Sequence, residues 1–387
     1  MNRKLRPSQI APVLRAPATS LGLDELAPVL AGLDAWTPGE KLYGVRFARS
    51  RGFVGSSGRL IVAPTAMDPD VLQLFGFADG LMILEVYGKR GILDVATREV
   101  IPPVFKDADL GGFSEGAWAV QHARGWGHVD RQGQWRVTPR FAEARRFSDG
   151  LAAVRHGDRW GFVDLRGELV IPLRFTRVGR FAAGLCPCEA GEGTWGFLGR
   201  DGAWVIPPTY QFAGEFSEGR AMVVQGGLAG FIDASGREVI PPRHASVTSF
   251  HDGLAKTEDP RTFDERDKQP PDCFYATRHG YIDRDGEPVL ELPAGDYPYI
   301  FTRGLAAVGR PHPGEAARRW GFIDRRGATV IPFQYDEACV FDDLGFAQVH
   351  TRDGWHVIDE AGEYLARIVL DDDGAARLLG RTGQLWP

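Results

Sequence analysis

The sequence predicts an all-β protein made of tandem repeats of about 34 residues, each with three antiparallel strands. Three recurring signals support this prediction: a strand-like segment that begins around Trp-Gly, a turn of the form Asp-x-x-Gly, and a strand that ends in Ile-Pro. The first glycine of each unit marks the period, and these glycines are Gly52, Gly91, Gly127, Gly161, Gly196, Gly230, Gly280 and Gly321, with a degenerate ninth unit near Trp355. A fixed period of this kind is typical of architectures in which each unit buries its neighbour.

Residues 160–175 illustrate the first two strands of a unit. The segment from Trp160 to Asp164 is rich in aromatic and β-branched residues, which favour a strand. The stretch from Asp164 to Gly167 predicts a tight turn, because an aspartate side chain accepts local backbone N–H groups and a glycine tolerates positive φ. The next strand ends at Ile171-Pro, where the missing proline N–H interrupts the ladder.

The third strand of a unit is expected at segments such as residues 150–154, which read Gly-Leu-Ala-Ala-Val and lead into the next Trp-Gly. No unit shows the apolar period of an amphipathic helix. Aromatic residues recur six positions apart before this strand, and we expect them to fill the core between layers: Phe141 with Phe147, Phe175 with Phe181, Tyr210 with Phe216, and Tyr335 with Phe341. Such units can curl into a β-propeller-like ring, which we favour, or stack into an open β-solenoid.

The repeats divide the chain into three parts. Residues 41–365 form the array of about eight to nine units. Residues 1–40 precede it and are expected to cap its open end, with a short helix after Asp24 that is interrupted near Pro28. Residues 366–387 form a second cap, since a terminal repeat otherwise exposes its stacking face.

One interval of the array is much longer than the others. It separates Gly230 from Gly280 and contains residues 257–272, which are charged and include prolines. A segment of this composition buries little apolar surface. We therefore expect an exposed loop inserted into the repeat scaffold.

Composition and charge exclude several classes of protein. The chain has 45 Lys and Arg residues against 51 Asp and Glu residues, a net charge of −6, and no basic run, so we expect no nucleic-acid partner. No apolar run is long enough to span a membrane, and the first residues contain no signal-peptide core. The four cysteines show no disulfide-framework spacing, and these features together predict a cytoplasmic protein without a membrane partner.

One motif matches a catalytic pattern. The segment from Gly112 to Gly116 satisfies G-x-S-x-G, the pattern that exposes an esterase nucleophile, with Ser114 as the serine. The sister segments 146–150 and 215–219 are also followed by strand-like residues, whereas a nucleophile elbow requires a helix. We interpret Ser114 as part of a structural turn, and we expect no catalytic residue in this chain.

We also expect no metal or cofactor site. Cys186 and Cys188 would face the same side of a strand as small core residues, since no further ligands at zinc spacing accompany them. His128 and His244 occupy positions that are aromatic in sister units, which indicates a core role. A calcium site would need converging oxygens, and we assign a local turn function instead to the recurring aspartates Asp130, Asp164, Asp233, Asp283, Asp324 and Asp359.

The tryptophans of the repeat share one register. Stacking platforms for sugars or bases are one interpretation of these rings. An interlocking core stripe is the interpretation we favour, because identical positions in successive units meet at the same layer of the core. The residues concerned are Trp126, Trp160, Trp195 and Trp320.

These features resemble the bacterial WG-repeat, or KWG-repeat, family, whose unit joins a Trp-Gly strand, an Asp-x-x-Gly turn, a Val-Ile-Pro-Pro strand end and a Phe-Ser-x-Gly-Leu-Ala segment. The resemblance covers roughly residues 43–365, with Arg90, Ala229 and His279 in place of tryptophan in three units. It implies an all-β repeat protein used for interaction, with no common set of catalytic residues.

The function predicted from the sequence is a non-enzymatic scaffold that binds another protein through the variable turns and the 257–272 loop. The regular positions hold structural residue types, whereas the turns vary freely. Two alternatives stay open at this point: a carbohydrate or small-ligand binding module that uses aromatic residues on one face, and, less favoured, a hydrolase.

Overall fold

The computed structural model describes most of the chain. The residues described are 16–17, 26–33, 36, 42–47, 50–55, 60–62, 71–78, 80–191, 193–260, 277–312, 317–342, 345–370, 376–380 and 385–386. Contacts divide the chain into two compact units, one made of Met1–Arg180 with Leu365–Pro387 and the other of Phe181–Tyr364. Within the described ranges no helix is long and apolar enough to cross a membrane.

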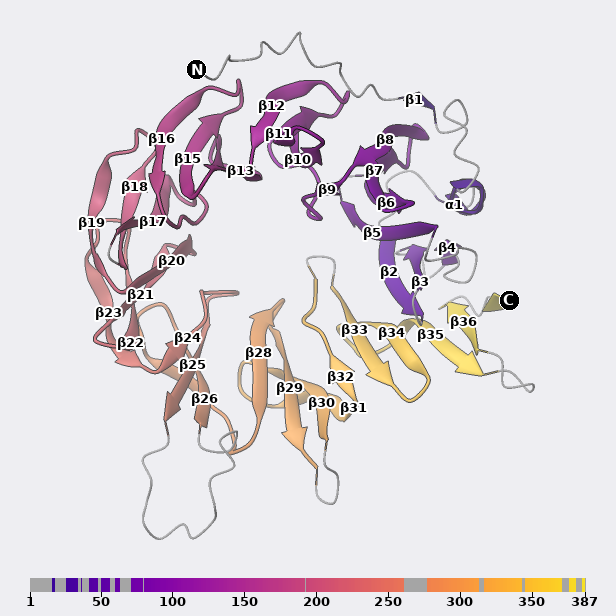
Figure 1. Ribbon diagram of the computed structural model, residues 1–387. Coiled ribbons are helices and arrows are strands. Elements are labelled where there is room, and N and C mark those ends of the chain that lie inside the picture. The colour runs from indigo at the N-terminus through magenta and orange to yellow at the C-terminus, as the bar shows by residue number, and fades with distance from the viewer. Residues whose placement is uncertain are drawn as a thin grey trace. The chain divides into compact units, whose positions relative to one another are not determined.

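In the first unit, successive antiparallel sheets, here called blades, contain strands that pair in sequence order (Figure 1). The first blade has β5 (Leu72–Ala78), β6 (Leu81–Val86), β7 (Lys89–Asp94) and β8 (Glu99–Phe105), with β1 (Ala16–Pro17) paired to β8. The second has β9 (Asp107–Ala108), β10 (Ala117–His122), β11 (Gly125–Asp130) and β12 (Trp135–Phe141). The third has β13 (Glu143–Ser148), β14 (Leu151–His156), β15 (Arg159–Asp164) and β16 (Leu169–Phe175). The remaining strands are β2 (Leu42–Phe47), β3 (Ser50–Gly55), β4 (Leu60–Val62), β35 (Tyr364–Leu370), β36 (Ala376–Gly380) and β37 (Leu385–Trp386).

The second unit continues the same pattern. It begins with β17 (Leu185–Gly191), β18 (Thr194–Gly199) and β19 (Trp204–Tyr210), followed by β20 (Phe212–Ser217), β21 (Arg220–Gln225), β22 (Leu228–Ile232) and β23 (Glu238–His244). The next blade has β24 (Ser246–Val247), β25 (Ala255–Pro260), β26 (Thr277–Ile282) and β27 (Pro288–Glu291). Then come β28 (Tyr297–Thr302), β29 (Leu305–Pro311), β30 (Arg318–Asp324) and β31 (Thr329–Tyr335), and finally β32 (Glu337–Ala338), β33 (Phe346–Thr351) and β34 (Gly354–Asp359).

The blades confirm the predicted fold class, an all-β protein of tandem antiparallel repeats of the β-propeller type. One detail differs, because most described blades have four strands where the sequence predicts three. The added strand holds the second aromatic of two predicted pairs, since β13 holds Phe147 and β20 holds Phe216, whereas Phe181 and Phe341 lie outside the strands. A two-residue turn at Asp149 and Gly150, both with positive φ, joins β13 to β14 and favours a tight hairpin.

The Trp-Gly and Ile-Pro segments lie on adjacent strands and together form a β-bulge. In the blade β13–β16, Trp160 pairs with Phe175 and Phe162 with Ile171, so β16 bulges outside Gly161. A Cβ on Gly161 would lie 2.5 Å from the carbonyl oxygen of Ile171. Glycine is therefore required here by close approach of the backbone, and the same contact recurs at Gly91, Gly127, Gly196, Gly230 and Gly321.

Consecutive blades interlock through pairs of aromatic rings. Each pair joins the ring that directly follows the repeat glycine in one blade to a phenylalanine of the next blade: Phe197 with Phe216, Phe231 with Phe250, Tyr281 with Phe301, and Phe322 with Phe341, at centroid distances of 5.1, 4.7, 4.6 and 4.8 Å. The predicted core role of the second aromatic of each pair is thus confirmed for Phe216 and Phe341. Their ring partner is a residue of the preceding blade rather than the aromatic six positions earlier.

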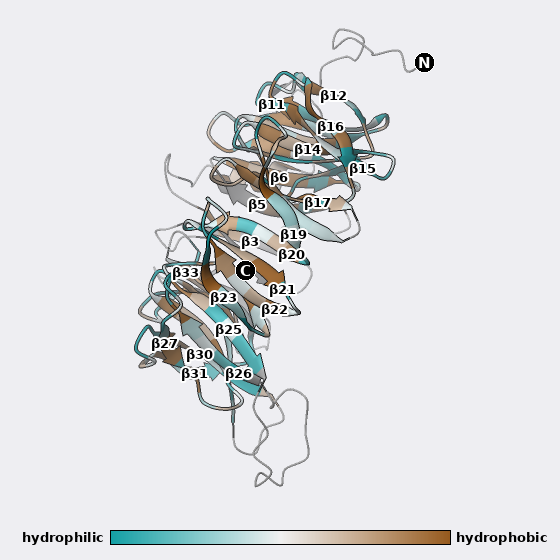
Figure 2. Cartoon of the chain, turned by 90° about the vertical axis from the view of Figure 1, so that its left-hand side faces the viewer, coloured by the Kyte–Doolittle hydropathy of each residue, from teal (hydrophilic) through white to brown (hydrophobic). Residues whose placement is uncertain are grey.

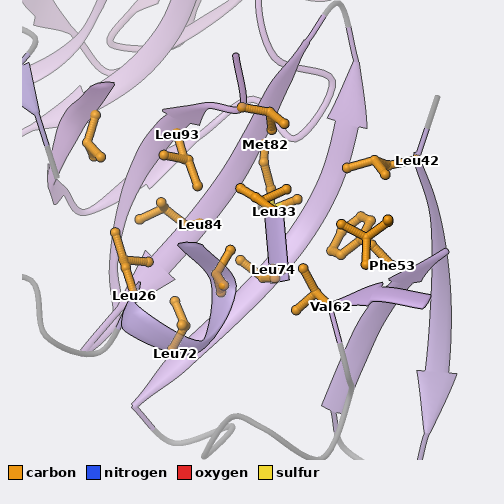
Figure 3. Close-up of a cluster of buried hydrophobic side chains, with 14 of the residues drawn as sticks. Leu26, Leu33, Leu42, Phe53, Val62, Leu72, Leu74, Met82, Leu84 and Leu93 are labelled. Atoms are coloured by element: carbon orange, nitrogen blue, oxygen red, sulfur yellow. The ribbon is translucent and has the colours of Figure 1, made fainter. Parts of the chain in front are cut away.

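The predicted helix of the N-terminal part is α1 (Ala27–Leu33). Pro28 does not interrupt it, because it lies in the first turn, where no helical hydrogen bond needs its N–H. Val29 and Leu33 pack with Phe53 and Leu84 in a buried cluster of the first unit (Figure 3). The cap boundaries at residues 1–40 and 366–387 stay predictions, and of the predicted 257–272 loop residues 261–272 lie outside the described part of the chain.

Candidate functional site

Ser114 lies in the predicted turn. The turn consists of Glu115 and Gly116, both with positive φ, and it leads into strand β10 rather than into a helix. The hydroxyl of Ser114 donates a hydrogen bond of 2.7 Å to the carbonyl oxygen of Phe147 in the next blade. Ser217 makes the same bond to Phe250. This position therefore joins blades, and the strand–turn–helix geometry of a nucleophile elbow is not formed.

Carboxylates on the same turns also join blades. Glu115 accepts a hydrogen bond from the backbone N–H of Gly150 at 2.9 Å, and Glu218 accepts one from Gly253 at 2.9 Å. An Arg284 guanidinium lies 3.6 Å from Glu218. These acidic side chains are engaged by neighbouring backbone and by arginine, so their repetition has a structural cause.

The recurring turn aspartates have the predicted local function. In each described turn one carboxylate oxygen accepts two backbone N–H groups, as Asp164 does from Arg166 and Glu168 at 2.9 Å. At Asp233 the hydroxyl of Ser235 adds a further hydrogen bond and is the main cause that lowers the pKa of this carboxyl to about 2. Among the described residues, no three His, Cys, Asp or Glu side chains are grouped as metal ligands.

Cys186 and Cys188 face the same side of β17, as predicted. Both are buried, and their sulfur atoms lie 3.6 Å apart without a disulfide. Cys339 is exposed and forms no disulfide, while Cys273 lies outside the described residues.

The histidines at aromatic positions are buried. His128 packs on Phe147 at 4.7 Å between ring centroids, and its Nε2 lies 2.8 Å from the carbonyl oxygen of Arg145. Burial lowers the pKa of His128 to about 4, so the ring is neutral at neutral pH. His244 is also buried, but its Nδ1 lies 3.1 Å from a carboxylate oxygen of Asp259.

Three of the four repeat tryptophans are buried, which confirms the predicted core stripe. They are Trp160, Trp195 and Trp320, whereas Trp126 is half-buried. The guanidinium of Arg145 lies 4.3 Å from the centroid of Trp160 and covers one face of that ring.

The sequence interpretation missed a group of aromatic residues in the second unit. Tyr297 and Tyr299 alternate along β28, and they are 38% and 36% exposed. In the sister strand β13 the same positions hold Glu143 and Arg145, and Glu143 pairs with Arg155. Alignment of these two repeats shows that tyrosines replace charged residues at both positions. This replacement is the sequence signal that could have identified the aromatic group.

These tyrosines form a continuous aromatic patch with two further rings, His279 and Trp320. Tyr299 lies 4.9 Å from Trp320, while Tyr297 lies 6.1 Å from Tyr299 and 5.8 Å from His279. Trp320 is only 9% exposed, so the two exposed tyrosines pack on a buried ring. The patch therefore extends over two adjacent blades, β24–β27 and β28–β31.

Two cations around the aromatic patch are paired with carboxylates. The ammonium of Lys256 lies 2.8 Å from Glu258, and the guanidinium of Arg310 binds Asp296 at 2.8 Å. Burial lowers the pKa of His279, which leaves its ring neutral at neutral pH. Strand β25, which holds Lys256 and Glu258, and strand β26, which holds His279, are teal in Figure 2, in contrast to the apolar β21. The site thus combines exposed aromatic surface with two ion pairs and a third cation, Arg318, which lies 5.9 Å from the centroid of Tyr297.

The comparisons with known proteins agree with the fold. A solved structure described as a crystal structure of the eukaryotic initiation factor is similar over 85% of this chain and 95% of that chain, with a TM-score of 0.56 and 10% identity. BamB from Moraxella catarrhalis is similar over 75% of this chain and 94% of its own, with a TM-score of 0.41 and 15% identity. The first likeness concerns the fold alone, and no curated protein matches this sequence.

Comparison of the sequence with family models identifies the family. A family model described as a WG containing repeat matches residues 126–160, 160–187, 195–228, 230–258 and 320–355. The matched stretches contain the Trp-Gly and Ile-Pro segments and the ring pairs that join the blades. The chain is a member of the WG-repeat family.

Proposed function

We propose that this protein is a non-enzymatic scaffold that binds another protein through the aromatic patch of its second unit. One observation carries the proposal: two tyrosines stand exposed at positions where the sister blade β13–β16 has charged residues. Tyrosine is enriched in protein interfaces because it offers apolar area at a small cost in side-chain entropy and also a polar hydroxyl.

The remaining repeated polar groups support a scaffold. Ser114, Glu115 and Asp164, which have the residue types of catalytic groups, are all hydrogen-bonded to backbone groups of their own turn or the next blade. Residues of this kind hold a rigid surface in place. A rigid surface loses little entropy on binding, which favours affinity.

We also propose that the partner is a protein and that the chain is located in the cytoplasm. A net charge of −6 without basic runs favours a protein over a nucleic acid or an anionic membrane. The buried thiols of Cys186 and Cys188, whose sulfur atoms lie 3.6 Å apart without a disulfide, fit a reducing cytoplasm.

A second candidate is a carbohydrate or small-ligand binding module. The contiguous rings of Tyr297, Tyr299 and Trp320 are the observation that favours it, since binding sites for small molecules are rich in aromatic side chains. This candidate uses the same patch, so one experiment distinguishes the two.

The experiment places a photo-crosslinking amino acid, p-benzoylphenylalanine, at position 297 of the full chain in its host cell. The matched control places it at position 87, where Tyr87 is 65% exposed in the first unit. We expect a discrete protein adduct from position 297 and none from position 87. Equal labelling at both positions, or no protein adduct at 297, contradicts the proposal, and an adduct that only glycosidases remove favours the carbohydrate module.

A further inference from the structure

We propose that the aromatic patch takes an extended, proline-rich segment of its partner in the polyproline II conformation. This inference rests on the proposed function and names the chemistry that the patch recognises. Proline-rich segments dock on aromatic-lined surfaces because they are preformed and lose little entropy on binding.

Ring orientation is the first argument. Tyr297 is nearly perpendicular to three neighbouring rings, at interplanar angles of 79° to His279, 78° to Tyr299 and 82° to Trp320. Adjacent perpendicular rings present ridges and notches rather than one flat face. Pyrrolidine rings fit between such ridges, whereas a pyranose ring stacks best on a single exposed ring face.

Polar groups give the second argument. A polyproline II segment has no internal hydrogen bonds, so its carbonyl oxygens need donors. Tyr297 and Tyr299, which are 38% and 36% exposed, carry hydroxyl groups that can supply such donors.

Charge is the third argument. Lys256 is bound to Glu258 and Arg310 to Asp296, and Lys256 lies 5.3 Å from the centroid of Tyr297, whereas Arg318, 5.9 Å from the same centroid, donates to the carbonyl oxygen of Gly295. A strongly cationic ligand would have to break these pairs or lie against Arg318 without a partner for its own charge. An uncharged ligand such as a proline-rich segment avoids both costs.

The direct test measures binding of a fluorescently labelled decaproline peptide to the full chain by anisotropy, with a linear cellohexaose as competitor. We expect saturable binding of the peptide to the unsubstituted protein and no competition by the sugar. Tyr297→Glu restores the residue type of the sister strand β13, and Tyr299→Ala removes one ring. Each change is expected to weaken binding by about tenfold or more, as for central interface aromatics.

Two controls make the result specific. Tyr87→Ala removes an exposed tyrosine of the first unit and is expected to leave the affinity unchanged. Tyr299→Phe keeps the ring without its hydroxyl and is expected to retain most of the binding. A urea unfolding curve for each variant shows whether the blades are intact.

The possible outcomes separate this inference from the proposed function. No binding of decaproline to the unsubstituted chain, or equal losses in the Tyr87→Ala control, overturns the inference. If position 297 still crosslinks to a protein, the scaffold proposal stands without it. Binding of cellohexaose that is lost in Tyr299→Ala overturns both in favour of a saccharide ligand.

Discussion

The hydroxyl of Ser114 donates a 2.7 Å hydrogen bond to the carbonyl oxygen of Phe147, which lies in the following blade. The bond is one of several that repeat along the chain between consecutive blades. A serine, which acts as a nucleophile in some enzymes, therefore serves here to connect two neighbouring sheets.

Ser114→Ala is expected to lower the free energy of unfolding by about 1 kcal/mol, because the Phe147 carbonyl loses its donor. Urea denaturation followed by circular dichroism measures this change. Ser217→Ala, which removes the equivalent bond to Phe250, is expected to have a similar effect. Loss of a measurable esterase activity in Ser114→Ala without loss of stability would contradict the structural role.

Gly161→Ala is expected to destabilise the protein by about 3 kcal/mol or more. The new Cβ would lie 2.5 Å from the carbonyl oxygen of Ile171, and backbone cannot move aside as a flexible side chain can. Gly157→Ala is the control, since Gly157 has positive φ but open space around the added methyl group. The control is expected to cost only about 1 kcal/mol from its backbone conformation. Equal losses for the two variants would show that close approach is not the cause.

Stability is expected to fall between about pH 6.5 and pH 4 because of His128. In the unfolded chain this histidine binds a proton near its ordinary pKa, whereas burial lowers its pKa to about 4 in the folded protein. The unfolded state thus binds more protons in this window, so acidification favours unfolding. The contribution is of the order of 3 kcal/mol when the window has been crossed.

His128→Phe removes this source of pH dependence. Phenylalanine occupies the equivalent position in three blades of the second unit, at Phe197, Phe231 and Phe322. Urea midpoints measured at several pH values for both proteins test the prediction. An unchanged slope in the variant would assign the pH dependence to other groups.

Trp160→Ala is expected to cost about 3 to 5 kcal/mol, as large-to-small changes in a core do. The ring is buried and is covered on one face by Arg145. Tyr297→Ala serves as a comparison, because its ring is 38% exposed and its loss is expected to cost about 1 kcal/mol or less. Thermal or urea unfolding separates these values, and a small loss in Trp160→Ala would indicate a ligand-stacking rather than a core position.

The repeat pattern contained enough information to predict the blades but not their number of strands. Glycine, proline and aromatic positions at a fixed period indicated sheets, turns and core contacts. The added strand was missed because β13, β20 and β28 each have a register shift before their phenylalanine. This shift breaks the alternation of apolar and polar residues by which a strand is recognised.

The aromatic patch was missed for a different reason. Exposure depends on which residues of neighbouring blades surround a side chain, and this is not encoded in local spacing. Tyr297 has the character of an ordinary strand residue, and its equivalent is Glu143 in β13 but the aromatic Phe212 in β20, so only a comparison of several repeats shows how this position varies. Positions that depart from an internal repeat are therefore the useful signal for function in such a chain.

The Ile-Pro signal lies on strands that end their sheets, such as β16, β23 and β31. An open sheet border can recruit strands from other molecules, which leads to polymerisation or amyloid-like aggregates. Pro172, Pro241 and Pro332 remove amide donors from these borders. The same prolines that shape the bulge thus leave fewer amide donors on the sheet borders, and their joint replacement is expected to favour strand pairing between molecules.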